Sequence, residues 1–157
     1  MNPYAADLGS REARDVVETT PLELHRLAGR IGHGRMTAPR APGKWSPRDI
    51  LAHLADCEIA FAFRLRQTLA EDRHVMQPFD QDKWARPYAS LEANAALAAF
   101  EALRAWNVAL LKTVTTDQMG KQANHPERGD MTFRTIVETM AGHDLHHIKQ
   151  LEDVAAT

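Results

Sequence analysis

The sequence predicts an all-α protein, folded as one four-helix bundle that spans residues 1–157. Ala, Leu, Glu and Arg, which favour helices, are abundant, and runs of β-branched residues are few. Apolar residues recur at helical spacing in four separate segments. The length of 157 residues suits one domain with a substantial core.

The first long helix is expected to begin at Thr20 and to run to about Gly32. Proline is favoured in the first turn of a helix and is disruptive in its interior. Pro21 therefore predicts a helix start, with Thr20 as its N-cap. Residues 10–19 are expected to form a short separate helix, and residues 1–9 a flexible tail.

The second helix has the clearest start in the sequence. Ser46 is a good N-cap, Pro47 fits the first turn, and Asp49 completes an arrangement that resembles a capping box. The helix should end near Ala70. At about 100° per residue, His53 lies at the border of its apolar stripe and should point into the bundle or along its edge.

The second half of the chain predicts two more helices. Residues 71–89 form a long connection, which in a small bundle often serves as a crossover or has a functional role. Ser90 is expected to cap a third helix over about 91–115, rich in alanine. Residues 116–131 read as a loop.

The last helix should begin at Thr132 and run to about Ala155. His143 and His147 are four residues apart, so they differ by roughly 40° around the helix and can reach one point. Both fall on or beside the apolar face, whereas His146 falls outside it and is assigned to the surface or an interface.

These two histidines and His53 predict a metal site. Three neutral imidazoles packed together without a ligand would leave several buried lone pairs in need of partners, and a divalent ion satisfies one nitrogen on each ring. Three ligands leave the coordination shell open, as in catalytic sites. Zinc and nickel both accept imidazole ligands. Asp144 replaces the glutamate that an HExxH zinc protease would need, so a peptidase is unsupported.

Four further side chains near these histidines in the sequence or the predicted fold are candidates for roles at this site. Asp56 could orient a ligand or a water, although a helix-pairing role fits its position better. Asp144, near the apolar face, is the better candidate for a carboxylate behind the ligands. Cys57 reads as a buried apolar thiol rather than a ligand, and His125 as a turn residue rather than part of the site mouth. The tryptophans are interpreted as packing anchors: Trp45, Trp84 and Trp106.

Composition narrows the partners and the compartment. Lys and Arg number 19 against 21 Asp and Glu, a net charge of −2, which argues against nucleic acid or a membrane surface as a partner. A small-molecule substrate is expected instead. The single cysteine suits a reducing compartment, and no apolar leader or membrane span is evident, so we expect a cytoplasmic protein.

Two segments, GKWSPRDILAHLADCE and HPERGDMTFRTIVETMAGHDLHHIKQL, resemble the DinB/YfiT-like superfamily of four-helix metal-dependent enzymes. The likeness covers nearly the whole chain from about Thr20 onward. It implies an up-down-down-up bundle with a long crossover, and it maps the metal ligands of the family to His53, His143 and His147. Members of the family bind nickel, zinc or similar ions and are often dimers, so the resemblance also implies a homodimer.

The resemblance leaves the reaction open. Some relatives transfer low-molecular-weight thiols such as bacillithiol, and others are mycothiol-dependent isomerases. We expect a metal-dependent enzyme, either a thiol S-transferase with such a thiol as co-substrate or a hydrolase in which Asp56 or Asp144 serves as base. The alternative is a dimeric stress-response protein that binds metal without turnover.

Overall fold

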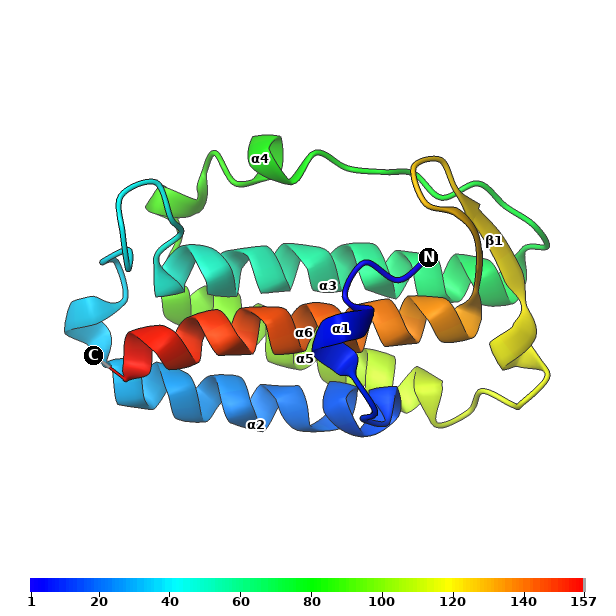
Figure 1. Ribbon diagram of the computed structural model, residues 1–157, viewed down its shortest axis with the longest axis horizontal. Coiled ribbons are helices and arrows are strands. Elements are labelled where there is room, and N and C mark those ends of the chain that lie inside the picture. Colours follow the sequence, from blue (N-terminus) through cyan, green and yellow to red (C-terminus); the bar gives the residue numbers. More distant parts are fainter. Residues whose placement is uncertain (157) are drawn as a thin grey trace.

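The computed structural model describes residues 1–156, and across them four long helices lie side by side (Figure 1). They are α2 (Ala13–Ile31), α3 (Pro47–Ala70), α5 (Ala93–Leu111) and α6 (Phe133–Ala155). Both α2 and α3 pack against α5 and α6. The predicted all-α four-helix bundle is confirmed.

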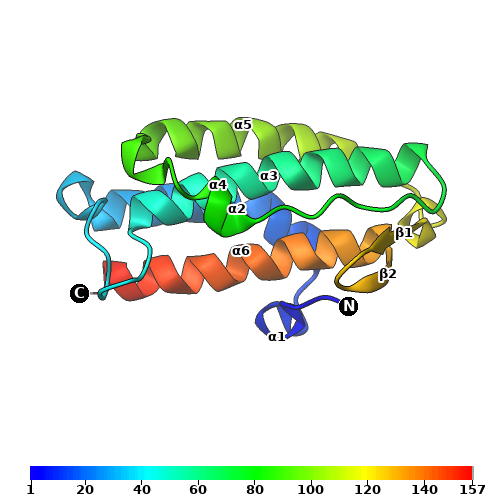
Figure 2. The same cartoon turned by 90° about the horizontal axis from the view of Figure 1, so that it is seen from above.

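The helices follow the up-down-down-up order. After α3 the chain returns along the length of the bundle, so that α5 starts at the same end as α3 and runs parallel to it (Figures 1 and 2). The returning segment contains α4 (Gln81–Trp84) and the 3₁₀ helix η2 (Tyr88–Ser90). In the part of the chain that the structure describes, no helix is both long and apolar enough to cross a bilayer.

The predicted break at Thr20 is wrong, because α2 continues through Pro21 as one helix. Proline has no N–H to donate to the carbonyl four residues earlier, which here belongs to Val17. The guanidinium of Arg104 on α5 donates to that carbonyl oxygen at 2.9 Å. A neighbouring helix thus supplies the hydrogen bond that Pro21 cannot make.

The predicted starts of α3 and α6 are confirmed. Ser46 and Asp49 form a reciprocal capping box, with Pro47 in the first turn, and α3 ends at Ala70 as expected. The hydroxyl of Thr132 accepts a hydrogen bond from the Thr135 backbone N–H at 3.2 Å and caps α6.

The region around α5 differs from the prediction. Ser90 belongs to η2 rather than capping α5, whose N-cap is Glu92. The expected loop over residues 116–131 contains the 3₁₀ helix η3 (Gln118–Gly120) and an antiparallel hairpin. Its strands are β1 (Gln122–His125) and β2 (Gly129–Thr132), each only four residues long. Strands this short carry little periodic signal.

The N-terminal segment is not the flexible tail that was expected. It forms the short helix α1 (Ala5–Leu8), which packs across α6 near the middle of the bundle (Figure 1). Leu8 is buried in the core. A second short element, the 3₁₀ helix η1 (His33–Arg35), follows α2.

A polar layer divides the core of the bundle in two. One apolar cluster lies toward the hairpin and contains Phe133 and Leu65, and the other lies toward the opposite end and contains Leu24 and Leu54. Between them each long helix contributes buried polar residues: Thr20, His53, Glu58, Arg104, Asn107, His143, Asp144 and His147. The candidate site therefore sits at mid-length in the bundle.

Candidate metal centre

The structure brings the three predicted histidines together. Ring centroids lie 5.0 Å apart for His53 and His143, 4.9 Å for His53 and His147, and 4.5 Å for His143 and His147. The Nε2 atoms of His53 and His143 are 3.0 Å apart. All three side chains are buried, with exposed fractions of 2 to 5%. Helices α3 and α6, which contact each other, place them there.

The surroundings keep these imidazoles uncharged at neutral pH. Burial lowers the pKa of His53 to about 4. Burial and the neighbouring His53 lower the pKa of His147 to about 3, and burial also lowers that of His143. A neutral imidazole keeps a lone pair on one nitrogen and can therefore bind a cation.

Hydrogen bonds around the rings suit a metal ligand set. The Nδ1 of His147 lies 2.9 Å from Oε1 of Gln150. An amide oxygen only accepts, so Nδ1 donates and Nε2 is left with its lone pair, as in many metal-binding histidines. The Nδ1 of His143 has no hydrogen-bond partner among residues 1–156, which marks this cluster as incompletely satisfied.

Cys57 is closer to the histidines than its assignment as an apolar thiol suggested. Its Sγ lies 3.5 Å from Nε2 of His53. Donor atoms of His53, Cys57 and His143 all fall within 4.8 Å of one another. The tightest triplet of donors thus contains Cys57 in place of His147, although the His147 ring is as near the other two rings as they are to each other. Burial raises the pKa of the Cys57 thiol. Imidazole and sulfur donors suit zinc and similar transition metals.

The two carboxylates suggested as bases have other partners. Oδ2 of Asp56 accepts a hydrogen bond from the Tyr88 hydroxyl at 2.8 Å. Both oxygens of Asp144 accept from Arg104, at 2.7 and 3.1 Å, and Oδ2 also accepts from the Thr20 hydroxyl at 3.0 Å. Asp144 therefore belongs to a structural network rather than standing free beside the histidines. His125 accepts from the Glu127 backbone N–H in the hairpin turn.

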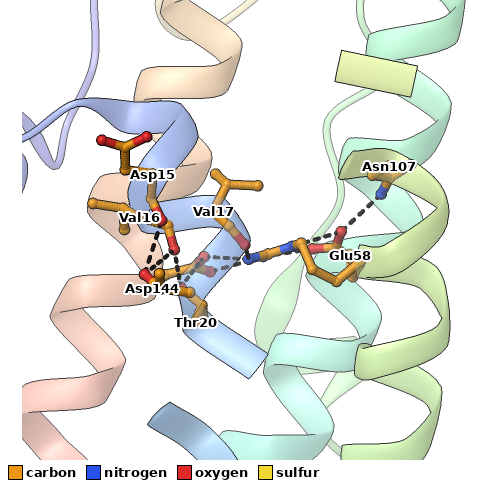
Figure 3. Close-up of polar contacts among 9 residues, drawn as sticks. Asp15, Val16, Val17, Thr20, Glu58, Asn107 and Asp144 are labelled. Carbon is orange, nitrogen blue, oxygen red and sulfur yellow. Dashed lines mark hydrogen bonds and ion pairs between the residues drawn. The ribbon is translucent and has the colours of Figure 1, made fainter. Parts of the chain in front are cut away.

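That network centres on Arg104 and was missed by sequence reasoning. Figure 3 labels its partners Val17, Glu58 and Asp144. Its guanidinium makes five hydrogen bonds: two to Glu58, two to Asp144 and one to the Val17 carbonyl. Asn107 donates to Glu58 at 2.7 Å. Burial would lower the pKa of Arg104, but the charges of Asp144 and Glu58 outweigh it and raise the pKa. Helical spacing was the available signal, since Arg104 lies four residues after the buried Phe100 and seven before Leu111.

Two aromatic side chains flank the histidines. Trp45 lies 4.7 Å from His53 and 6.3 Å from His147, measured between ring centroids. Tyr4 lies 5.2 Å from His143. Of the tryptophans interpreted as packing anchors, Trp45 thus packs at the site itself, whereas Trp106 is 66% exposed and anchors nothing in the core.

A cavity of about 570 Å³ adjoins this cluster and reaches it at His147. Tyr4, Trp45 and His147 all line it, together with residues of the loop before α3 and of α4. A cavity of this size accommodates a small organic molecule. The site is thus a nearly dry imidazole cluster with an adjoining pocket.

Comparisons with known proteins identify the family to which the chain is similar. A family model described as the DinB superfamily matches residues 17–151. A Bacillus cereus (strain 03BB102) protein named "putative metal-dependent hydrolase" is 26% identical over 132 residues, which cover 83% of this chain and 76% of that relative. A Bacillus thuringiensis subsp. konkukian relative with a similar name gives the same values.

A solved structure shows the same fold. YfiT from Bacillus subtilis, described as a probable metal-dependent hydrolase with an unusual four-helix bundle topology, superposes with a TM-score of 0.85. The match covers 92% of this chain and 84% of YfiT at 23% sequence identity. At that identity the likeness supports the bundle and its topology.

Proposed function

This chain belongs to the DinB superfamily, and on that premise we propose that it is a metal-dependent enzyme acting on a small molecule. His53, His143 and His147 would hold a divalent ion, zinc or nickel, beside the pocket between Tyr4 and Trp45. The observation that supports this most strongly is the convergence of three buried, uncharged imidazoles from two helices, with centroids 4.5 to 5.0 Å apart.

The donor set fits such an ion on physical grounds. Water is largely excluded from the cluster, and the Nε2 atoms of His53 and His143 face each other at 3.0 Å, so one ion between them could accept a lone pair from each. Asp144 lies directly beside His143 in sequence, and its ion pair with Arg104 fixes that turn of α6. Gln150 holds the ring of His147 in one orientation.

Two reactions are compatible with this site, hydrolysis and thiol transfer. A bound divalent ion would lower the pKa of a water or of a thiol and so supply a nucleophile at neutral pH. In the hydrolytic version Asp56 is the candidate base, held by the Tyr88 hydroxyl through Oδ2. In the thiol version the pocket admits a low-molecular-weight thiol and an electrophile. The names of the relatives favour hydrolysis; the family resemblance keeps thiol transfer in consideration.

Metal content tests the ligand assignment. The untagged protein should contain about one equivalent of divalent metal by elemental analysis, and His147→Ala should lose most of it. His25→Ala is the matched control, because the His25 side chain is 73% exposed on α2. Equal metal content in all three proteins would refute the assignment.

Activity assays separate the two reactions and the non-catalytic alternative. The metal-loaded protein is screened against activated esters and against low-molecular-weight thiols with monochlorobimane. The expected result is a rate above that of the metal-stripped protein in one of the two screens. Metal binding without turnover in either screen would favour a dimeric metal-binding protein with a role in stress response.

The homodimer is a further proposal, suggested by the family. Three exposed apolar side chains on α3 and α5 are compatible with it: Ile59, Phe63 and Trp106. Sedimentation velocity gives the test: a single species of monomer mass at micromolar concentration would contradict it.

A further inference from the structure

Residues 1–9 lie outside the region matched by the family model, 17–151, yet they cover part of the histidine cluster. The α1 segment lies against α6 (Figures 1 and 2), and Tyr4, just before it, packs 5.2 Å from His143 between ring centroids. Its Asp7 pairs with Lys149 Nζ at 2.7 Å and with His146 Nδ1 at 3.4 Å. These contacts hold it on the exposed side of α6, next to the buried His143 and His147.

Gly142 is the point on α6 against which this segment packs. It is the residue before His143 and lies in the interior of α6, where glycine is an unfavourable choice. A Cβ at this position would meet the Tyr4 carbonyl oxygen at 2.5 Å and the Tyr4 Cβ at 2.7 Å. The backbone of Tyr4 therefore rests directly on α6, at a point where any larger residue would push it away.

The close contact between Gly142 and the Tyr4 backbone positions the Tyr4 ring beside the histidines. The ring centroid lies 5.2 Å from that of His143 and 5.6 Å from that of His146. Tyr4 also lines the cavity that reaches His147, with Trp45 as another of its walls.

We infer that residues 1–9 are part of the active site, and that Tyr4 is a specificity-determining wall that limits the size of the ligands reaching the histidines. Gly142 is the positioning residue that seats this wall. The identity of the substrate that Tyr4 admits rests on the proposed function. The effect of Tyr4 on access to the histidines does not, since the contacts described above involve no metal.

The rate at which Cys57 reacts with thiol reagents measures access to the histidine cluster. It is the single cysteine of the chain, it is 6% exposed, and its Sγ is 3.5 Å from Nε2 of His53. The experiment measures its labelling rate in the full-length, metal-free protein with a small reagent, methyl methanethiosulfonate, and a bulky one, dithiobis(nitrobenzoate). Each rate is divided by that of free cysteine under the same conditions.

Two pairs of variants isolate the wall. Gly142→Ala displaces the segment, and Gly29→Ala is its control, because a Cβ there has no heavy atom within 4 Å apart from its own chain neighbours and the backbone of its helix. Tyr4→Ala removes the ring, and Tyr4→Phe keeps it. Tyr4→Ala leaves Gly142 and the backbone that rests on it unaltered in sequence, so it remains informative if Gly142→Ala lowers the stability of the fold. Thermal melts identify any variant in which global unfolding dominates labelling.

The expected result is selective for the bulky reagent. Gly142→Ala and Tyr4→Ala should accelerate its reaction with Cys57 by about tenfold or more, a change of ~1.4 kcal/mol in the free energy of access. In both variants the ratio of the labelling rate with the small reagent to that with the bulky reagent should be lower than in the wild type. Gly29→Ala and Tyr4→Phe should match the wild type. Unchanged labelling in Tyr4→Ala, or equal acceleration in the control variants, would overturn the inference whatever the metal analysis gives.

Discussion

Two buried polar clusters occupy the same layer of this bundle, and they differ in how completely their hydrogen bonds are satisfied. The guanidinium of Arg104 makes five hydrogen bonds to two carboxylates and a carbonyl. In the histidine cluster, Nδ1 of His143 finds no partner within residues 1–156. A satisfied cluster fixes the packing of helices, whereas the facing Nε2 atoms of His53 and His143, 3.0 Å apart, can give lone pairs to a ligand.

The comparison also concerns charge. The Arg104 cluster contains a cation and two carboxylates in nearly dry surroundings, with exposed fractions of 1% for Arg104, Glu58 and Asp144. The histidine cluster is neutral, because burial depresses the pKa of each ring. Removing one member should therefore have very different consequences in the two clusters.

The largest expected effect follows from breaking the satisfied cluster. Arg104→Met should destabilise the protein by about 3–5 kcal/mol, because Glu58 and Asp144 would remain buried without their cation. It would also leave the Val17 carbonyl without the donor that replaces the missing N–H of Pro21. Urea unfolding followed by circular dichroism gives the free energy of unfolding.

The matched change in the other cluster is His147→Gln in the metal-free protein, which should cost far less, about 1 kcal/mol. If the two variants were equally destabilised, the distinction between a structural and a functional cluster would be lost.

This contrast explains what could be predicted from sequence. The capping box at Ser46 and the pair of His143 and His147 depend on residues three or four positions apart, so a helical wheel is enough to find them. The His53 partner required only that two amphipathic helices face each other. The cluster of three histidines was thus accessible to sequence reasoning as a set of candidates.

The parts that were missed depend on contacts between distant segments. Pro21 looks like a helix start until Arg104 is known to satisfy Val17. Asp144 looks like a free carboxylate until the same arginine is placed beside it. Gly142 carries no local signal for the docking of Tyr4, which depends on a close approach of two backbones. Sequence patterns report periodicity well but do not report such pairings.

The second prediction concerns pH. The pKa of His53 falls to about 4 and that of His147 to about 3 in the folded protein, against ~6.5 in the unfolded chain. Between these values the unfolded state binds more protons, so stability rises with pH there and is lost as pH falls below about 6.5. The metal-free protein should lose about 2–4 kcal/mol between pH 7 and 5.

Denaturant titrations at a series of pH values measure this loss. The double variant His53→Gln/His147→Gln is the control, since without these rings the pH dependence should be shallower over the same interval. A wild-type curve that is flat from pH 7 to 5 would contradict the neutral, buried state of the histidines.

The third prediction is that metal stabilises the protein through the unsatisfied cluster alone. Zinc at a free concentration about a hundred times its dissociation constant should add ~2.7 kcal/mol to the free energy of unfolding. His147→Ala should abolish most of this gain. Lys112→Ala, at an exposed ion pair with Glu18, should retain it. Equal stabilisation of the wild type and His147→Ala would assign the metal to another site.

The smallest expected effect decides whether Cys57 belongs to the metal centre or only borders it. Its Sγ is within reach of His53, but burial raises the pKa of its thiol, which disfavours the thiolate unless an ion is bound. Loading the protein with cobalt(II) gives the measurement, because a thiolate ligand adds a strong charge-transfer absorption in the near ultraviolet and an imidazole does not. With three histidine ligands this absorption should be absent, and Cys57→Ala should keep its cobalt and lose only about 1 kcal/mol of stability from a small cavity. An intense band that disappears in Cys57→Ala would instead place sulfur in the ligand set. The histidine cluster would then differ from the Arg104 cluster by a metal–thiolate bond as well as by its charge.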